Sequence, residues 1–293
     1  MIRLRILAFV CGLLLAAPLA LGEPAVDAVS HVAVPVTQLD RAVSFYEALD
    51  FVREDGRAAD GAAARMRLGR EHIVLRQVSG RPVPAQSRSN DLWFQHLAIV
   101  VSDIDRAYDI VLRAGAVPIS AGPQLLPAWN PNAGGIRAVY FRDPDQHPLE
   151  LIQFPAAKGE PRWQERDRLF LGIDHTAIAA SDTDRSLAFY RDRLRLRIVG
   201  TSENWGPEQE KLSGVPGAHV RITTLRATDG PGIELLHYLA PRDGSPLPPD
   251  TGPDDLWSTA IVLRSAGLPS QSETLSDPDG HAVCLVAVIE GSP

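Results

Sequence analysis

The segment 137–154 carries a carboxylate in a position from which it could do chemistry. It reads as a strand over 138–141, a turn on Asp-Pro-Asp-Gln at 143–146, and a second strand over 149–154. The second strand is apolar at nearly every position except Glu150. A carboxylate inside such a strand is costly to bury unless it is paired or binds a metal. Glu150 is therefore either a surface residue on one face of the strand or a ligand in a cavity.

The same turn and strand recur along the chain, which indicates internal duplication. A Leu-Ser-Asp-Pro-Asp-Gly-His run near the C-terminus repeats both, with Cys284 in the position of Glu150. Two further apolar runs align with the second strand, and they carry Glu234 and Val74 in that position. We therefore expect one structural unit to be present four times.

The elements around these strands follow one order in each unit. The first unit has a strand over 29–36, a helix over 39–49 and three strands near 51–54, 63–68 and 72–78. Its first segment alternates in polarity and is rich in valine, whereas the helical segment repeats apolar residues at helical spacing. Each unit is therefore expected to be a strand, a helix and three more strands.

The later units repeat this order. The second opens with a strand over 96–103 and a helix over 104–114, the third with a strand over 175–182 and a helix over 183–194, and the fourth with a strand over 256–263. The following segment 264–273 is too short and too rich in Gly, Pro and Ser for a full helix. The fourth unit is therefore expected to be truncated.

The tripeptide Asp-Leu-Trp marks a larger repeat. It occurs at Asp91 and Asp255, so that units one and two together resemble units three and four. The polar stretch 155–168 separates the two halves. We expect a first domain over 23–157, a linker over 158–170 and a second domain over 171–293.

The N-terminal segment is typical of a secretory signal peptide. Arg3 and Arg5 precede an apolar run over 6–21, and small residues at 20–22 offer a cleavage site, which predicts a signal peptide over 1–22. At roughly 16 residues the apolar run is short for a membrane span. We therefore expect a periplasmic or secreted protein with no stable membrane insertion after cleavage; an uncleaved N-terminal anchor is the alternative.

The composition narrows the classes of function. The 293 residues are 45% hydrophobic and 22% charged, as in soluble globular proteins, and a net charge of -7 without basic runs argues against nucleic-acid binding. Cys11 leaves with the signal peptide, so the mature chain keeps only Cys284 and forms no internal disulfide, which fits a bacterial periplasm. The sequence has no Gly-rich phosphate loop, no Gly-x-Ser-x-Gly elbow and no Cys-x-x-Cys pair.

The hairpin DPDxHxxEL at 143–151 and the run HxxIxxSDxDRSLAFY at 175–190 resemble the vicinal oxygen chelate superfamily. This superfamily includes glyoxalase I, extradiol dioxygenases, methylmalonyl-CoA epimerase and fosfomycin or bleomycin resistance proteins. The resemblance covers essentially the whole mature chain. It implies an α+β fold, in which four βαβββ units form two tandem glyoxalase-like domains with curved mixed sheets around cavities. It also implies a divalent metal, held by residues on the first and last strands of each unit.

The resemblance further implies which residues occupy the ligand positions. Unit one supplies His31 and Val74, unit two His96 and Glu150, unit three His175 and Glu234, and unit four Ser258 and Cys284. Imidazole nitrogen and carboxylate oxygen together suit Zn, Fe(II), Mn, Co or Ni. We therefore expect a divalent metal bound by residues from the set His31, His96, Glu150, His175 and Glu234.

Two pairings of the units are open. If neighbouring units pair within each half, His31, His96 and Glu150 share one cavity, the two-histidine-one-carboxylate set of non-haem iron oxygenases. Tyr140 then falls where extradiol dioxygenases keep a tyrosine near the metal. The histidine that those enzymes place just upstream is missing from 130–137.

If the units pair across the halves, as in fused glyoxalases, one cavity receives all four ligands His96, Glu150, His175 and Glu234. Val74 and Cys284 then share the other cavity, as expected if one site kept its metal and its twin decayed. In the retained site the metal would bind vicinal oxygens of the substrate and stabilise an enediolate, while Glu150 or Glu234 moves the proton.

The favoured function is an exported metal-dependent enzyme that acts on a small oxygenated molecule by glyoxalase-like isomerase or lyase chemistry, with Glu150, Glu234 and Tyr140 as catalytic candidates. An extradiol-type Fe(II) dioxygenase is the first alternative. A metal-free protein that sequesters a small molecule is the second. Glutathione adducts are an unfavourable substrate class, because an exported protein meets little reduced glutathione.

Overall fold

The computed structural model describes residues 25–54, 62–266 and 272–287. The first half contains β1 (Val26–Val36), α1 (Leu39–Glu47), β2 (Val52–Glu54), β3 (Ala63–Leu68), β4 (Glu71–Gln77), β5 (Gln95–Val101), α2 (Ile104–Arg113), β6 (Val117–Pro118), β7 (Gln124–Leu125), β8 (Arg137–Arg142) and β9 (Pro148–Gln153). The second half contains η1 (Pro161–Gln164), β10 (Phe170–Ala179), α3 (Thr183–Leu187), η2 (Ala188–Arg193), β11 (Arg197–Trp205), α4 (Pro207–Ser213), β12 (His219–Arg226), β13 (Gly232–Ala240), β14 (Ala260–Ser265), β15 (Glu273–Ser276) and β16 (Ala282–Ala287). The expected α+β fold is confirmed.

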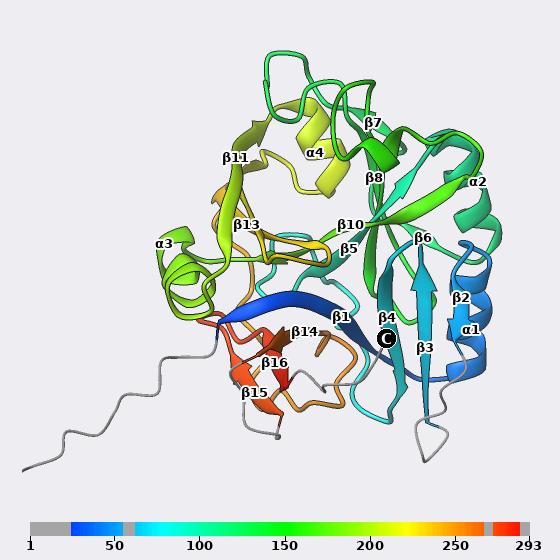
Figure 1. Ribbon diagram of the computed structural model, residues 1–293. Helices are drawn as coiled ribbons and strands as arrows, with labels where there is room; N and C mark the ends of the chain where they lie inside the picture. Colours follow the sequence, from blue (N-terminus) through cyan, green and yellow to red (C-terminus); the bar gives the residue numbers. More distant parts are fainter. Residues whose placement is uncertain (1–24, 55–61, 267–271, 288–293) are drawn as a thin grey trace, which may run out of the picture.

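The strands form two sheets, and each sheet combines both halves of the chain (Figure 1). One sheet has the order β11-β12-β13-β10-β5-β9-β8-β6, with β7 beside β8, and the other has the order β15-β16-β14-β1-β4-β3-β2. β5 runs antiparallel to β10, and β1 runs antiparallel to β14. The second unit therefore pairs with the third, and the first with the fourth. Of the two pairings that the sequence left open, the structure has the one across the halves.

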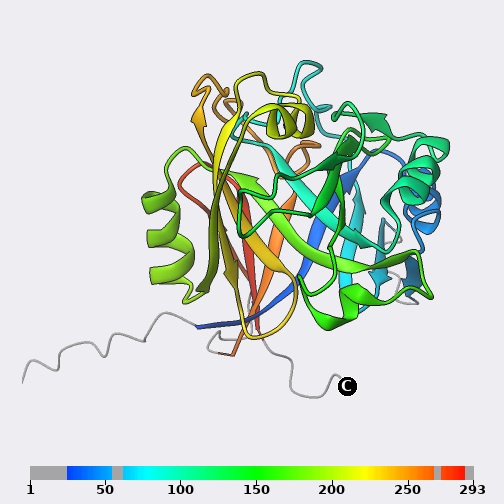
Figure 2. The ribbon, with the colours of Figure 1, turned by 90° about the horizontal axis from the view of Figure 1, so that it is seen from above.

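Three of the helices lie at two opposite ends of the molecule. Figures 1 and 2 show α1 and α2 at one end and α3 with η2 at the other. α2 and α3 begin after Asp103 and Asp182, whose side chains accept hydrogen bonds from the backbone N–H groups of Arg106 and Arg185 and thereby cap the helices. From Ala188 the third helix continues as a π-helix within the span that the sequence predicts to be helical.

The two faces of β5 have different neighbours. Leu97, Ile99 and Val101 pack against α1 and α2 in a core that joins both sheets. Ala98 points to the opposite face, because successive residues of a strand alternate, and it packs in a smaller cluster with Trp163. His96 shares the face of Ala98. The strand thus places Leu97, Ile99 and Val101 in the core that joins both sheets, and His96 with Ala98 and Val100 on the other side.

A repeated hydrogen bond ties the helix of one unit to the hairpin of the next. The Tyr46 hydroxyl donates to the Asp143 carboxylate over 3.2 Å, and the Tyr190 hydroxyl donates to Asp277 over 3.1 Å. The Asp143 carboxylate also lies 3.0 Å from Nδ1 of His147, whose other ring nitrogen lies 2.9 Å from a backbone carbonyl of the fourth unit. All five side chains are buried. The Asp-Pro-Asp turns therefore act as joints between the units.

Two of the segments with a predicted structure lie partly or wholly outside the described residues. The predicted signal peptide lies there, as do residues 267–271 of the segment that was expected to lack a full helix. Within the predicted linker, residues Pro161–Gln164 form the short helix η1, whose Trp163 is buried. Among the described helices, none combines the length and apolar character that crossing a membrane requires.

Candidate metal centre

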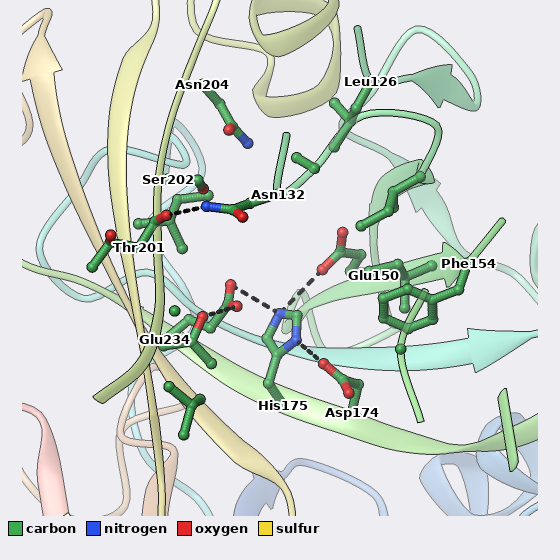
Figure 3. Close-up of a pocket in the computed structure, with 18 of the residues that line it drawn as sticks. Leu126, Asn132, Glu150, Phe154, Asp174, His175, Thr201, Ser202, Asn204 and Glu234 are labelled. Atoms are coloured by element: carbon green, nitrogen blue, oxygen red, sulfur yellow. Dashed lines mark hydrogen bonds and ion pairs between the residues drawn. The ribbon is translucent and has the colours of Figure 1, made fainter. Parts of the chain in front are cut away.

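A cavity of about 580 Å³ opens on the face of the nine-stranded sheet that carries the histidines. Its wall includes Tyr140 and Glu150 from the second unit and Asp174, His175 and Glu234 from the third. Figure 3 shows the His175 ring between the carboxylates of Glu150, Glu234 and Asp174. Two units that are far apart in the sequence thus contribute polar side chains to one cavity.

Three buried side chains converge beside this cavity, and two of them, Glu150 and His175, line it. Nε2 of His96 lies 3.1 Å from Oε2 of Glu150 and 3.4 Å from Nε2 of His175. The same Glu150 oxygen lies 3.4 Å from Nε2 of His175. These donor atoms all lie within 4.8 Å of one another, and in the described ranges no other three His, Cys, Asp or Glu side chains do so.

Glu234 lies next to this trio. Its Oε2 is 3.4 Å from Nε2 of His175, and its Oε1 accepts a hydrogen bond of 2.7 Å from the Thr224 hydroxyl. Its side chain is 17% exposed, against 7% for Glu150. Glu234 therefore borders the trio from the more open side of the cavity.

The register of the strands explains why these side chains meet. In the antiparallel pair β5 and β10, His96 lies opposite Ala177, and His175 lies opposite Ala98. In the flanking parallel pairs, Glu150 lies beside Ala98, and Glu234 lies beside Ala177. All six residues are therefore on one face of the sheet. The two alanines leave room between the larger side chains, in an arrangement related by a pseudo-twofold axis between β5 and β10.

Asp174 reaches the cavity through a β-bulge. The register between β10 and β5 shifts between Ile173 and His175, so that Asp174 is the extra residue and both it and His175 line the cavity. Its carboxylate lies 3.0 Å from Nδ1 of His175 and accepts hydrogen bonds from Arg226 and Trp163. Asp174 is not among the site residues predicted from the sequence. The available signal was the residue before each first-strand histidine. Unit one has Ser30 before His31 at an equivalent bulge, and unit three has Asp174 before His175.

The carboxylates favour positive charge at His175. Burial lowers the pKa of His175, but Glu234, Asp174 and Glu150 outweigh burial and raise this pKa well above its ordinary value. Burial raises the pKa of Glu150, but hydrogen bonds and charge from His175 and His96 lower it to about 2. The pKa of Asp174 is about 2 for the same kind of reason, since His175 and Arg226 outweigh its burial.

The donor set fits a divalent cation. Two imidazole nitrogens and the Glu150 oxygen converge, with Glu234 adjacent, and such mixed nitrogen and oxygen donors suit borderline ions such as Zn²⁺, Mn²⁺ and Fe²⁺. The ring of His175 is oriented by Asp174, as metal-binding histidines commonly are. Nδ1 of His96 is buried without a hydrogen-bond partner in the described structure, and its ring instead packs 4.8 Å from the Tyr140 ring.

Tyr140 stands beside this donor set. The residue is buried, and its ring centroid lies 4.8 Å from that of His96. Burial, followed by the charge of Glu150, raises the Tyr140 pKa well above its ordinary value. The hydroxyl therefore keeps its proton and can donate it in a hydrogen bond to a molecule in the cavity.

His31 lies elsewhere. It is on β1 of the seven-stranded sheet, where its Nδ1 is 3.1 Å from the Ser30 hydroxyl. The site expected from His31, His96 and Glu150 is therefore wrong, because β1 pairs with β14 and β4, not with β5. Burial, followed by the charges of two nearby basic side chains, lowers the His31 pKa to about 4 and keeps the ring neutral.

The ligand position expected at Ser258 also needs correction. In the parallel pair β14 and β16, Val262 lies beside Cys284, just as Ala98 lies beside Glu150 in the nine-stranded sheet. The residue two positions earlier, Ala260, therefore corresponds to His96. The twin of the metal site thus combines His31 with Val74, Ala260 and Cys284, which leaves one imidazole without a carboxylate at these positions.

The chain matches known proteins in sequence pattern and in fold. Residues 28–151 and 172–285 match the family model described as Glyoxalase/Bleomycin resistance protein/Dioxygenase superfamily. No curated protein matches the sequence. Glyoxalase I from Zea mays has a similar structure, with a TM-score of 0.59 and 16% identity over 89% of this chain and 92% of that one. A putative dioxygenase from Bacillus subtilis subsp. subtilis str. 168 has a TM-score of 0.54 and 12% identity over 90% and 86%. At these identities the structural likeness shows the fold alone.

Proposed function

Because the chain belongs to the glyoxalase/bleomycin resistance protein/dioxygenase superfamily, we propose that it is a divalent-metal-dependent enzyme that moves a proton on a small oxygenated molecule. The observation that carries this proposal is the convergence of His96, Glu150 and His175, with Glu234 beside them, in one cavity built from two units. The reaction class is an isomerisation or elimination at a carbon next to a carbonyl group.

The side chains at the site would have separate roles in binding the metal and in moving the proton. His96, His175 and Glu150 would hold the ion, because their donor atoms form the tight trio. A divalent ion in this position supplies Lewis acidity, which polarises a carbonyl or hydroxyl oxygen and acidifies the neighbouring C–H group. Glu234 lies at the more exposed side of the trio, and the Thr224 hydroxyl binds only one of its carboxylate oxygens.

Glu234 is therefore the proposed general base. Its Oε2, which lies 3.4 Å from Nε2 of His175 and is not bound by Thr224, takes a proton from the substrate carbon, and the C–H electron pair shifts toward the carbonyl group. The carboxyl group then returns the proton to the former carbonyl carbon, while the hydroxyl proton passes to the former carbonyl oxygen, so that the net reaction is an isomerisation that consumes no oxidant or reductant. Tyr140 donates a hydrogen bond to a substrate oxygen and thereby helps to orient it.

Metal analysis with matched variants tests the site. Purified mature protein should carry a stoichiometric divalent metal, and His96→Ala and Glu150→Ala should lose it. His31→Ala is the control, because this residue lies on the other sheet and should leave the metal content unchanged. A wild-type protein that binds no divalent metal would overturn the proposal and leave a sequestering protein instead.

Deuterium exchange tests the chemistry. The metal-loaded protein, incubated in D₂O with a simple α-hydroxyketone such as hydroxyacetone, should introduce deuterium at the carbon next to the carbonyl group. Glu234→Gln should lower this rate by about 100-fold or more while the metal remains bound. Unchanged exchange in Glu234→Gln would remove this residue from the role of base.

A second function is favoured by the composition of the trio. Two histidines and one carboxylate are also the ligands of non-haem iron oxygenases, here His96, His175 and Glu150. The same protein loaded anaerobically with Fe(II) should then consume oxygen with a catechol. Oxygen uptake without deuterium exchange would favour this second function over proton transfer.

The cellular location is a further part of the proposal. The basic residues and apolar run within 1–22 support export and cleavage of this segment. The intact mass of the protein isolated from its native host should then correspond to a chain that begins near Glu23. A mass that includes the initial segment would contradict cleavage.

A further inference from the structure

The cavity above the metal centre has an acidic wall. The carboxylates that line it are Glu150, Glu160, Asp174 and Glu234, whereas Arg226 is the one lysine or arginine that lines it in the described part of the chain. A divalent ion would balance the charges of Glu150 and Glu234. Of the other two carboxylates, Asp174 pairs with Arg226, and Glu160 pairs with Arg226 and with Arg162, which does not line the cavity.

The guanidinium of Arg226 is already engaged. Its Nη2 lies 3.0 Å from Oδ1 of Asp174, and its Nη1 lies 3.4 Å from Oε1 of Glu160. Asp174 in turn orients the metal-site histidine, so that withdrawing Arg226 would leave a buried carboxylate without its ion pair. The described cavity wall therefore offers no free cation to an anionic group of a ligand.

The rest of the wall suits uncharged groups. Side chains with amide or hydroxyl groups line it at Asn132, Thr201, Ser202, Asn204, Gln209 and Thr224. Apolar side chains line it at Leu126, Ile136, Ile152, Phe154, Leu212 and Ile222. Figure 3 shows Asn132, Thr201, Ser202 and Asn204 together on the side of the cavity away from His175. Neutral hydrogen-bonding groups beside apolar surface match a neutral molecule with hydroxyl, carbonyl or amide groups.

We propose that this site takes uncharged oxygenated substrates and rejects molecules that carry a carboxylate or phosphate beyond the metal-binding oxygens. This inference rests on the proposed function, whose substrate class it specifies. An anionic group that enters the cavity loses its hydration and meets like charge, and both effects weaken binding. A glutathione conjugate, which carries two carboxylates, would meet both penalties.

A pair of ligands of equal shape tests the proposal. 4-Carbamoylbenzohydroxamic acid and 4-carboxybenzohydroxamic acid share a head group with vicinal oxygens and differ at the far end by an amide against a carboxylate. Calorimetric titration into zinc-loaded protein near neutral pH should show that the amide binds at least about 10-fold more tightly, which corresponds to roughly 1.4 kcal/mol. Equal or tighter binding of the carboxylate would overturn the proposal.

Two matched variants locate the effect in the cavity. Val199 is 49% exposed and lines the cavity, whereas Val117 is 46% exposed and is absent from its lining. Val199→Lys adds a cation at the wall and should reduce the ratio of the two ligands' affinities by about threefold or more. Val117→Lys adds the same charge away from the cavity and should leave the ratio of the two affinities unchanged. Equal effects of both substitutions would assign the preference to the overall charge of the protein and would contradict the proposal.

Unsubstituted benzohydroxamic acid tests the metal centre separately from the preference for uncharged ligands. If it binds to zinc-loaded protein but not to His96→Ala, the metal centre stands, and the comparison of amide with carboxylate decides the substrate class alone. If it binds to neither and the wild type retains no zinc, the proposed function fails, and the inference fails with it.

Discussion

The Asp174 carboxylate lies 3.0 Å from Nδ1 of His175, the residue that follows it in the chain. Neighbouring side chains of a regular strand point to opposite faces, so this contact depends on the bulge at Asp174. The bulge allows the Asp174 carboxylate to fix the orientation of the His175 ring. Nε2 of His175 is then directed toward Glu150 and Glu234.

Removing this support should weaken metal binding. We expect Asp174→Asn to lower the affinity for a divalent metal by about 10- to 100-fold, because the His175 ring loses a charged partner that orients it. Competition with a chromophoric chelator measures this affinity. Asp167→Asn is the control, since that residue is exposed. If Asp174→Asn folds and binds metal as tightly as the wild type, the orienting role is refuted.

The alanines between the ligands should tolerate no larger side chain. Ala98 lies between His175 and Glu150 in the register of the sheet, so Ala98→Val should crowd the trio at a cost of about 1–3 kcal/mol and reduce metal affinity by about 10-fold or more. Ala33→Val is the matched control, because Ala33 has the same register beside Val74 in the seven-stranded sheet. A similar loss of affinity in both variants would count against this account.

Metal should stabilise the fold through the same trio. At a free metal concentration of about 100 times Kd, the native state gains roughly 2.7 kcal/mol, which for a chain of this size raises Tm by about 5–10 °C. Glu150→Gln should abolish this shift, whereas His31→Gln should retain it. Differential scanning calorimetry with and without metal provides the measurement. A full shift in Glu150→Gln would exclude this residue as a ligand.

The buried pair of His147 and Asp143 predicts a dependence of stability on pH. Burial lowers the pKa of His147, but Asp143 outweighs it and raises the pKa above its ordinary value. The stabilisation is then fully present below the unfolded pKa of about 6.5 and is lost as pH rises through the folded pKa. The difference in unfolding free energy between wild type and His147→Gln should be largest near about pH 6 and shrink toward about pH 9. Denaturant titrations across this range would reveal the opposite trend if the sign is wrong.

The duplicated joints should contribute similarly. Tyr46→Phe and Tyr190→Phe each remove a buried hydrogen bond to a carboxylate, and we expect each to lower the free energy of unfolding by about 1.5–3 kcal/mol. Metal affinity should stay unchanged, because the hydroxyls donate to Asp143 and Asp277 and not to the trio. Urea unfolding followed by circular dichroism gives the comparison. A loss in one variant only would show that the two joints are not equivalent.

Repetition made the units readable from the sequence. Strand alternation and helical spacing are local patterns, and their recurrence in several segments aligned His96 with His175 and Glu150 with Glu234. The boundaries agree closely, since α1 and α2 begin at Leu39 and Ile104, the first residues of the helices that the sequence predicts. A residue such as Glu150 in an apolar strand then had few physical explanations other than a ligand position.

Two site residues could not be identified correctly from local sequence patterns. Ser258 was assigned to a ligand position that Ala260 occupies. The first strand of the fourth unit has no histidine that would align it with His31, His96 and His175. Asp174 was overlooked, because a bulge depends on how β10 meets β5 and leaves only a weak trace in the dipeptide itself.

The sequence by itself determined the repeating unit, because that follows from periodicity, and its resemblance to the superfamily implied the α+β fold and the ligand positions. Only the tertiary structure decided which units share a cavity. β10 pairs with β5 and β1 pairs with β14, whereas pairing within each half would have joined β1 to β5 and β10 to β14. Local patterns do not distinguish the two, because every strand edge offers the same backbone hydrogen-bonding groups. That choice brought His175 to Glu150 and left His31 on the other sheet.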